Sequence, residues 1–191
     1  EEMLENRKRI SISGAQEKLS AIWEKGMVRL TKEGEKGTYI LKPIPRDMDR
    51  IEMVPANEHL TMQIAKQVYS LKTAENGLIF YRNGEPAYLT KRFDIDANSE
   101  KKLGLEDFAT LAGKTKETDG EEFKYNSSYE AIADLIKKYV GAYPVALEEF
   151  YKLVVFNFLF SNGDAHLKNF SLLETSQGDY ILSPAYDLIN T

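Results

Sequence analysis

The sequence contains no cysteine and only two histidines, His59 and His166, among its 191 residues. A disulfide framework and a metal site with thiolate ligands are therefore excluded. The two histidines lie far apart in the sequence, which argues against a zinc site built from imidazole ligands. A chain without cysteine is compatible with a reducing compartment, and we expect a cytoplasmic protein.

Long apolar runs and a surplus of basic residues are missing as well. No segment reaches the roughly 18 apolar residues that a membrane-spanning helix needs. The first residues, 1–7, are mostly acidic and polar, unlike a signal peptide. The formal net charge of −5 argues against non-specific binding of nucleic acid. We therefore expect a globular protein that neither enters a membrane nor binds nucleic acid directly.

The strongest functional signal is the segment 162–169, Asn-Gly-Asp-Ala-His-Leu-Lys-Asn, followed later by Asp187. Asp164 and Asn169 have the spacing D-x-x-x-x-N, which is typical of phosphoryl-transfer sites. In such a site one carboxylate serves the attacking hydroxyl, and further oxygen ligands hold Mg²⁺. We predict that Asp164 is the catalytic base and that Asn169 and Asp187 are metal ligands. An isolated Asn-Gly-Asp turn would be structural, but carboxylates next to strongly apolar segments need compensation.

Lys42 ends an apolar, β-branched segment over 38–42 and is followed by a proline. A lysine at such a position can contact phosphate groups, although a solvated strand-end lysine is the commoner case. Glu58 lies in the next predicted helix and is the expected partner, as in the lysine–glutamate pair of kinases. Glu52 is a second candidate for that role.

The loop that precedes the first strand, residues 11–18, is rich in small residues. Ser13, Gly14 and Ala15 would allow backbone N–H groups to approach phosphate oxygens closely. The glycine-rich pattern G-x-G-x-x-G is absent, so this loop alone could equally be an ordinary polar loop. Ser11 and Ser13 carry hydroxyl groups that could be phosphorylated.

Two further segments contribute candidates. Arg92 and Phe93 lie where the two halves of the chain join, and their backbone groups could meet an adenine base. His166 lies between Asp164 and Asn169, so it could orient the base, contact a phosphate or serve a structural role.

The chain divides into a β-rich N-lobe over 1–94 and a mainly helical C-lobe over 95–191, an α+β organisation. Alternation and turn residues predict strands over 19–23, 27–30, 38–42, 77–81 and 87–90. A helix should begin near Pro55 and bury the face that carries Leu60, Ile64, Val68 and Leu71.

In the second half we predict helices over 105–112, 129–140 and 147–160, with a polar loop over 115–128. The helix 147–160 is apolar nearly all round, which predicts a buried central helix. A hairpin should pair 170–173 with 180–182.

Taken together, these segments resemble the HipA family of serine/threonine protein kinases, the toxins of bacterial toxin–antitoxin systems. The resemblance rests on motifs that occur in family order, namely 13–19, 40–43, 92–94, 162–171 and 182–187. It implies a two-lobed kinase-like fold, ATP and Mg²⁺ as cofactors, and transfer of phosphate to a protein serine or threonine. By position it implies that Asp164 is the base, that Asn169 and Asp187 bind metal, and that Lys42 contacts phosphate.

The resemblance also implies autophosphorylation at Ser11 or Ser13, a DNA-binding antitoxin as partner, and a translation component such as an aminoacyl-tRNA synthetase as substrate. The family's usual N-terminal subdomain is missing, as in compact members where a separate small protein supplies that part. The chain lacks an initiator methionine and ends soon after Asp187, so we expect a segment of a longer protein without the last part of its C-lobe.

Two alternatives stay open. A kinase-fold phosphotransferase for a small molecule would share D-x-x-x-x-N and the later aspartate, but not the loop 13–18. A non-catalytic nucleotide-binding module is disfavoured, because Lys42, Asp164, Asn169 and Asp187 are all present.

Overall fold

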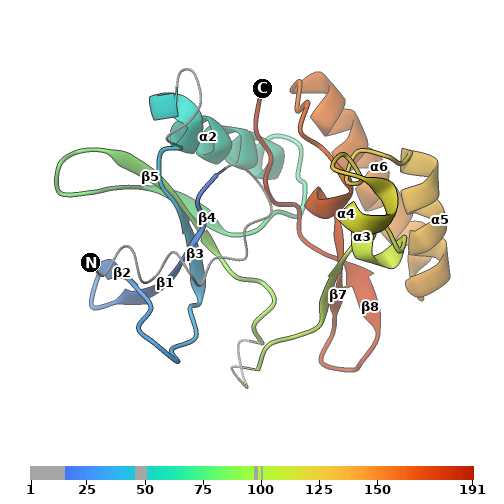
Figure 1. Ribbon diagram of the computed structural model, residues 1–191, viewed down its shortest axis with the longest axis horizontal. Helices are drawn as coiled ribbons and strands as arrows, with labels where there is room; N and C mark the ends of the chain where they lie inside the picture. Colours follow the sequence, from blue (N-terminus) through green and yellow to red (C-terminus); the bar gives the residue numbers. More distant parts are fainter. Residues whose placement is uncertain (1–15, 46–50, 97–98, 100) are drawn as a thin grey trace. The chain divides into compact units, whose positions relative to one another are not determined.

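The computed structural model describes residues 16–45, 51–96, 99 and 101–191, which form two compact units (Figure 1). The first unit comprises the described residues of Glu1–Leu60 together with Ala74–Arg92. The second comprises Thr61–Thr73 and Phe93–Thr191. Residues 61–73 thus belong with the second unit, whereas the proposed lobes, 1–94 and 95–191, follow the order of the chain.

A five-stranded antiparallel sheet forms the first unit, in the order β2-β1-β3-β5-β4. Its strands are β1 Leu19–Glu24, β2 Met27–Leu30, β3 Tyr39–Lys42, β4 Asn76–Phe80 and β5 Pro86–Lys91. Lys25 and Gly26 connect β1 to β2 with φ angles of 51° and 79°. Two central residues with positive φ match the tight turn that suits the twist of paired strands. All five strands predicted from the sequence are confirmed.

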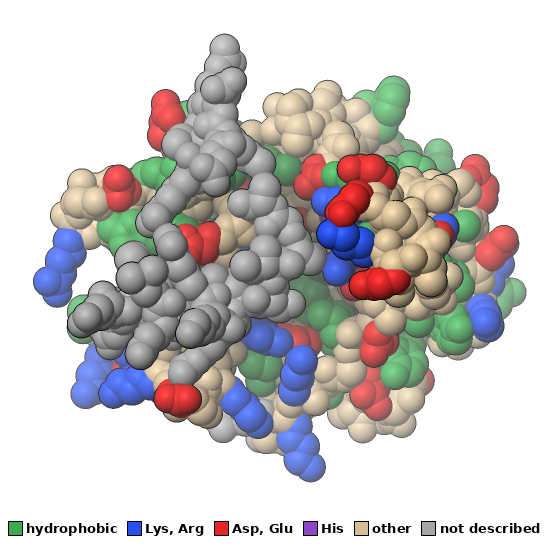
Figure 2. All heavy atoms as spheres, viewed as in Figure 1, with side chains coloured by type: hydrophobic (Ala, Val, Ile, Leu, Met, Phe, Trp, Pro, Cys, Tyr) green, Lys and Arg blue, Asp and Glu red, His purple; other side chains and the backbone are tan. Residues whose placement is uncertain are grey.

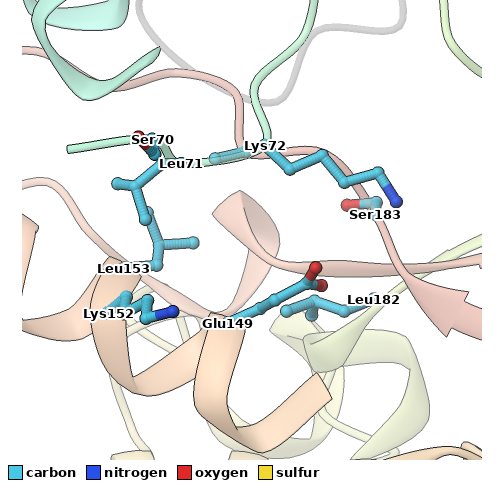
Figure 3. A pocket seen from close by; sticks show the side chains of 9 residues that line it. Ser70, Leu71, Lys72, Glu149, Lys152, Leu153, Leu182 and Ser183 are labelled. Atoms are coloured by element: carbon cyan, nitrogen blue, oxygen red, sulfur yellow. The ribbon is translucent and has the colours of Figure 1, made fainter. Parts of the chain in front are cut away.

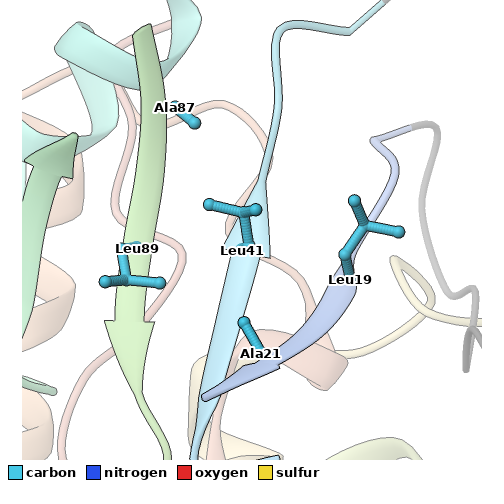
Figure 4. Packing of buried hydrophobic residues seen from close by; sticks show 5 residues of the cluster. All are labelled: Leu19, Ala21, Leu41, Ala87 and Leu89. Atoms are coloured by element: carbon cyan, nitrogen blue, oxygen red, sulfur yellow. The ribbon is translucent and has the colours of Figure 1, made fainter. Parts of the chain in front are cut away.

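One face of this sheet carries its hydrophobic core (Figure 4). Leu19 and Ala21 of β1, Leu41 of β3, and Ala87 and Leu89 of β5 are all nearly inaccessible to solvent. Side chains alternate between the faces of a strand, so the neighbours of these residues point to the opposite face. That alternation places Lys42, and Tyr88 opposite it in the register, on the other face of the sheet.

The helix α2, Val54–Gln67, follows the short 3₁₀ helix η2, Ile51–Met53. Its buried side chains recur every three or four residues: Pro55, Glu58, Thr61, Met62 and Ala65. The prediction that Leu60 and Val68 lie on the buried face is wrong, because 60% and 69% of their surfaces are exposed. The helix is rotated so that Glu58 lies on the buried face together with Pro55, Met62 and Ala65.

The second unit contains a three-stranded sheet, β6-β7-β8, and several helices. The elements in chain order are β6 Leu105–Asp107, α3 Phe108–Leu111, α4 Lys116–Asp119, α5 Tyr129–Tyr139, α6 Tyr143–Leu159, η3 Leu167–Asn169, β7 Ser171–Glu174 and β8 Tyr180–Leu182. The predicted hairpin and the helix over 129–140 are confirmed.

Two predictions for residues 105–128 are wrong. Residues 105–107 form a strand, not the start of a helix, because they pair with β7. The side chain of Asp107 then accepts the N–H of Thr110 and begins α3. The segment 115–128 is not a continuous loop, because Thr115 caps the short helix α4.

The helix α6 is buried on one side only, which corrects the prediction of a fully buried central helix. Phe150, Leu153 and Phe156 are nearly inaccessible, while 69% of Tyr151 and 84% of Phe158 is exposed. The apolar composition of α6 therefore covers two faces, and only one of them packs within the unit.

Charged side chains of both signs are mixed on the visible surface (Figure 2). Around α4, Lys114 lies 3.1 Å from Asp119 and Lys116 lies 2.7 Å from Glu121. Within the described ranges, the structure contains no helix that is long and apolar enough to cross a membrane.

Candidate functional site

Lys42 and Glu58 form a buried ion pair in the first unit. The Nζ atom of Lys42 lies 2.6 Å from Oε1 of Glu58, and only 4% and 2% of the two side chains is exposed. The ring of Tyr88 lies below the ammonium group, 5.3 Å from Nζ to the ring centre. Such a pair needs close geometry, because desolvation of both charges is costly. The predicted pairing is present, and Glu52, the second candidate, is exposed.

The segment 162–169 of the second unit is held at its start by α6 and by the end of the chain. Asn162 donates its side-chain N–H to Oδ1 of Asn157, and its backbone N–H to the carbonyl of the same residue. The N–H of Gly163 donates to Oγ1 of Thr191 at 2.9 Å. A Cβ atom at position 163 would lie 2.9 Å from that oxygen, so the glycine permits this close approach.

The end of the same segment is a single turn of 3₁₀ helix with reciprocal caps. The backbone N–H of His166 donates to Oδ1 of Asn169, and the N–H of Asn169 donates to the carbonyl of His166. Phe170 then enters the core, where its ring lies 5.4 Å from that of Phe150. The amide of Asn169 is thereby fixed in orientation by the loop itself.

Asp164 lies at the exposed tip of this segment, with 54% of its side chain accessible. The hydroxyl of Tyr125 donates to its Oδ1 at 2.5 Å. Nε2 of His166 lies 3.8 Å from the same oxygen, which is too long for a hydrogen bond. The hydrogen bond to Asp164 raises the pKa of Tyr125 to about 12. Tyr125 was not predicted from the sequence, because it lies in the segment expected to be a polar loop.

His166 is almost fully buried, and its Nδ1 has no hydrogen-bond partner among the described residues. Burial lowers the pKa of His166, and the positive charge of Lys124 lowers it further. The carboxylates of Asp164 and Asp187 act in the opposite direction. A neutral imidazole is therefore the favoured form near pH 7.

Asp187 has a φ angle of 56°, in the left-handed region that few residues other than glycine adopt. Strained backbone of this kind is often found at functional positions. The charge of Asp187 acts on His166 and also raises the pKa of Tyr186, whose burial is the larger cause. Its carboxylate is thus electrostatically coupled to the segment that carries Asp164 and Asn169.

Tyr186 joins the two predicted metal-binding positions. Its hydroxyl donates to the carbonyl of Lys168, the residue before Asn169, at 3.0 Å. The same oxygen lies 2.5 Å from Oγ of Ser171. Since Tyr186 is also the neighbour of Asp187, its hydrogen bond links the chain beside Asp187 to the chain beside Asn169. This role of Tyr186 was not predicted from the sequence.

The oxygen donors of Asn169 and Asp187 fit Mg²⁺. The amide oxygen of Asn169 uses one lone pair for the N–H of His166 and retains a second. The described residues contain no group of three or more His, Cys, Asp or Glu side chains able to hold a metal. Mg²⁺ often takes only one or two protein ligands and completes its coordination with phosphates and water, so two oxygen donors are compatible with its chemistry.

The remaining candidates are distributed as follows. Arg92 belongs to the first unit, where its backbone N–H donates to the carbonyl of Thr38. Phe93 belongs to the second unit, with its ring 5.7 Å from that of Tyr186. Ser11, Ser13, Gly14 and Ala15 lie outside the described residues, so their predicted roles stay predictions.

A small pocket of the second unit lies elsewhere, among the segment 70–72, α6 and β8 (Figure 3). Leu71, Lys72, Glu149, Leu153 and Ser183 are among its lining residues. It contains none of the predicted site residues.

Comparison with known proteins identifies relatives for nearly the whole chain. The family described as HipA-like C-terminal domain matches residues 10–191. A Haemophilus influenzae protein named "Putative kinase" is 30% identical over 190 residues, which cover 95% of this chain and 52% of that protein. "Putative kinase Y4dM" of Sinorhizobium fredii is 33% identical over 202 residues, covering 97% and 46%. The chain thus spans about half the length of these curated relatives.

Two solved structures share the fold. HipA of Shewanella oneidensis, solved with HipB and operator DNA, has a TM-score of 0.73 at 22% identity, over 95% of this chain and 44% of that one. The Helicobacter pylori proinflammatory kinase CtkA has a TM-score of 0.61 at 19% identity, over 88% and 53%. The predicted α+β kinase-like fold is confirmed by these neighbours.

Proposed function

Because the chain belongs to the family of HipA-like C-terminal domains, we propose that it is the ATP-using part of a serine/threonine protein kinase. The curated relatives are named as kinases, which supports a kinase-like enzyme that uses ATP. We further propose that the phosphate is transferred to a hydroxyl group of a protein.

The observation that carries the proposal is the clamped segment 162–169. It presents the carboxylate of Asp164 to solvent and fixes the amide of Asn169, while the charge of Asp187 reaches the same segment. In our proposal Asp164 accepts the proton of the acceptor hydroxyl, and Asn169 and Asp187 hold Mg²⁺ on the phosphates of ATP. When bound there, Mg²⁺ would supply positive charge beside the phosphate groups.

Lys42 supplies the positive charge for the nucleotide phosphates in this scheme. The carboxylate of Glu58, 2.6 Å away, orients the ammonium group, as in the lysine–glutamate pair of kinases. The proposal further assigns backbone contacts with phosphate to Ser13, Gly14 and Ala15, and adenine contacts to Arg92 and Phe93. His166 would stabilise the loop between the base and the metal ligand.

The proposal also covers the binding partners of the protein and its regulation by autophosphorylation. The HipA neighbour was solved with HipB and operator DNA, which supports a DNA-binding antitoxin as a partner. A protein substrate from the translation apparatus, action in the cytoplasm, and autophosphorylation of Ser11 or Ser13 follow from the resemblance.

The experiment is intact-mass spectrometry of the chain after incubation with Mg-ATP, beside an Asp164→Asn variant. We expect added phosphate on the wild type and none on the variant, with peptide mapping to choose between Ser11 and Ser13. Asp134→Asn is the matched control, since Asp134 is an exposed carboxylate of α5 whose ion pair within the described residues is with Lys137. ATP binding without transfer would favour the non-catalytic module, and consumption of ATP only with a small-molecule acceptor would favour the small-molecule phosphotransferase. Absence of ATP binding would overturn the kinase assignment.

A further inference from the structure

We propose that the hydroxyl of Tyr125 occupies the place of the acceptor hydroxyl at Asp164, so that Tyr125 is an internal competitor of the protein substrate. This inference rests on the proposed function, because it takes Asp164 as the catalytic base. It adds a regulatory side chain that no sequence motif contains.

The contact between Tyr125 and Asp164 has the geometry expected of a hydroxyl that is about to receive phosphate. In a kinase the catalytic aspartate accepts a hydrogen bond from the hydroxyl that will be phosphorylated. Here the hydroxyl of Tyr125 donates to Oδ1 of Asp164 at 2.5 Å. A hydrogen bond to a carboxylate is short and stronger than one between neutral groups. While it persists, the phenol uses an acceptor site on Oδ1 of Asp164 that a serine or threonine hydroxyl would otherwise use.

The surroundings of Tyr125 place its hydroxyl at this position. The N–H of Leu167 donates to the carbonyl of Lys124 at 2.9 Å, which attaches the preceding residue to the segment 162–169. The ring of Tyr125 meets that of His166 edge to face, with 5.1 Å between centres. Lys124 lies over the other part of the ring, with Nζ 4.8 Å from its centre. The contact with Asp164 is therefore supported from the backbone and from both neighbouring side chains.

Tyr125 is held by contacts that can be exchanged. Its side chain is 44% exposed, and it lies among short turns between α4 and α5. Side chains of exposed residues change rotamer on a timescale of nanoseconds. An incoming acceptor can therefore replace the phenol at Asp164 if it forms an equivalent hydrogen bond. The pKa of Tyr125, raised to about 12, keeps the phenol protonated and able to donate throughout the neutral range.

The consequence is a specific kinetic pattern. A competitor that leaves Asp164 before chemistry raises the KM for the acceptor and leaves kcat unchanged. A tyrosine that instead positions Asp164 for proton transfer would support kcat. Removing only the hydroxyl, in Tyr125→Phe, separates these roles, because the ring contacts with His166 and Lys124 remain.

The test measures phosphate transfer from Mg-ATP to dephosphorylated casein and to the chain itself, for the wild type and Tyr125→Phe. We expect the KM for casein to fall about tenfold at unchanged kcat, and self-modification to become faster. Tyr143→Phe is the matched control, since Tyr143 is also 44% exposed and its hydroxyl forms no hydrogen bond within the described part of the chain. It should behave as the wild type.

Each contrary result has its own meaning. An unchanged KM, a lower kcat, or phosphate mapped to Tyr125 itself would overturn the competitor role. Absence of transfer in every protein would be a failure of the proposed function, and the inference would fall with it. The contact itself is tested without activity by NMR of tyrosine labelled with ¹³C at Cζ. The Tyr125 resonance should titrate near pH 12 in the wild type and at lower pH in Asp164→Asn, and equal midpoints would overturn the contact.

Discussion

The ammonium group of Lys42 lies 2.6 Å from the carboxylate of Glu58, in a pair that is almost completely removed from solvent. The pair joins α2 to the face of the sheet opposite its hydrophobic core. The stability of the first unit therefore depends on keeping or replacing these two charged residues together.

Removing one partner of this pair should destabilise the fold strongly. Glu58→Leu leaves the ammonium of Lys42 buried without its counter-ion, so we expect the free energy of unfolding to fall by about 3–5 kcal/mol. The double variant Lys42→Met with Glu58→Leu should recover most of that loss, because apolar residues of similar volume can replace a buried pair. Urea unfolding followed by circular dichroism measures both effects.

The exposed pair of Lys91 and Glu75 provides the control for this experiment. Its atoms are 3.2 Å apart, but 51% and 68% of the side chains is accessible. Glu75→Gln should therefore change stability by less than about 1 kcal/mol. A similar loss for both single variants would contradict the assigned importance of burial.

His166 should titrate below the ordinary range of histidine, and two neighbours should move its pKa in opposite directions. Burial lowers the pKa, with a further contribution from Lys124, while Asp164 raises it. Lys124→Met should accordingly shift the midpoint of the His166 Cε1 proton resonance upward, and Asp164→Asn should shift it further downward. The pH titration by NMR is simple to assign, because the chain has two histidines.

The same shift has a consequence for stability. A histidine with a pKa lower in the folded state binds a proton more readily when unfolded. Its contribution is therefore present above pH 6.5, the ordinary value, and is lost as the pH falls through the folded pKa. The difference in unfolding free energy between the wild type and His166→Gln should narrow over that range, and a constant difference would contradict it.

Two phenylalanines of α6 should respond very differently to truncation. Phe156 is 1% exposed and stacks on Phe160 with 4.3 Å between ring centres, whereas Phe158 is 84% exposed. Phe156→Ala should cost about 3–5 kcal/mol of stability. Phe158→Ala should stay within about 0.5 kcal/mol of the wild type. Equal losses in urea unfolding would show that the exposed face of α6 is also packed in solution.

Substitutions of Asp187 should separate its backbone role from its chemical role. Asparagine tolerates a left-handed φ almost as well as aspartate, so Asp187→Asn should keep the unfolding free energy within about 0.5 kcal/mol. Valine does not, and Asp187→Val should lose about 1–2 kcal/mol or more. Both variants should reduce phosphate transfer about a hundredfold or more if the carboxylate binds Mg²⁺. Full transfer by Asp187→Asn would remove this residue from the proposed metal site.

Features that depend on residues close in sequence could be predicted from the sequence, whereas features that depend on distant contacts could not. Strand alternation and a two-residue turn are local, and the hairpin of β1 and β2 was predicted correctly. The segment 162–169 could be predicted as a candidate site because Asp164 and Asn169 are close in sequence. The buried face of α2 was missed, because apolar periodicity treats Glu58 as solvated, and only the tertiary contact with Lys42 reverses that assignment.

The other misses share this cause. Leu105 to Asp107 became a strand because a partner strand arrives from far along the chain. Tyr125 and Tyr186 act through hydroxyl groups on residues distant in sequence from their hydrogen-bond partners. Tyr125 lies in no recognised motif, and the motif 182–187 pointed to Asp187 but not to the hydrogen bonds of Tyr186. Composition likewise could not reveal that α6 packs through one face, since both of its faces are apolar.

The pairing of β6 with β7 brings together two parts of the second unit that are far apart in sequence. The strand β6 ends at Asp107 and its partner β7 begins at Ser171. The helices α3 to α6 and the segment with Asp164 all lie in the stretch of chain between these two strands. Contacts between residues so far apart form late in folding, because the intervening chain must first be ordered. Amide protons of β6 and of residues 166–169 should then exchange with solvent as one cooperative unit. The arrangement of Asp164 and Asn169 would form in a single step, when β6 pairs with β7, and would be lost in the same step when that pairing opens.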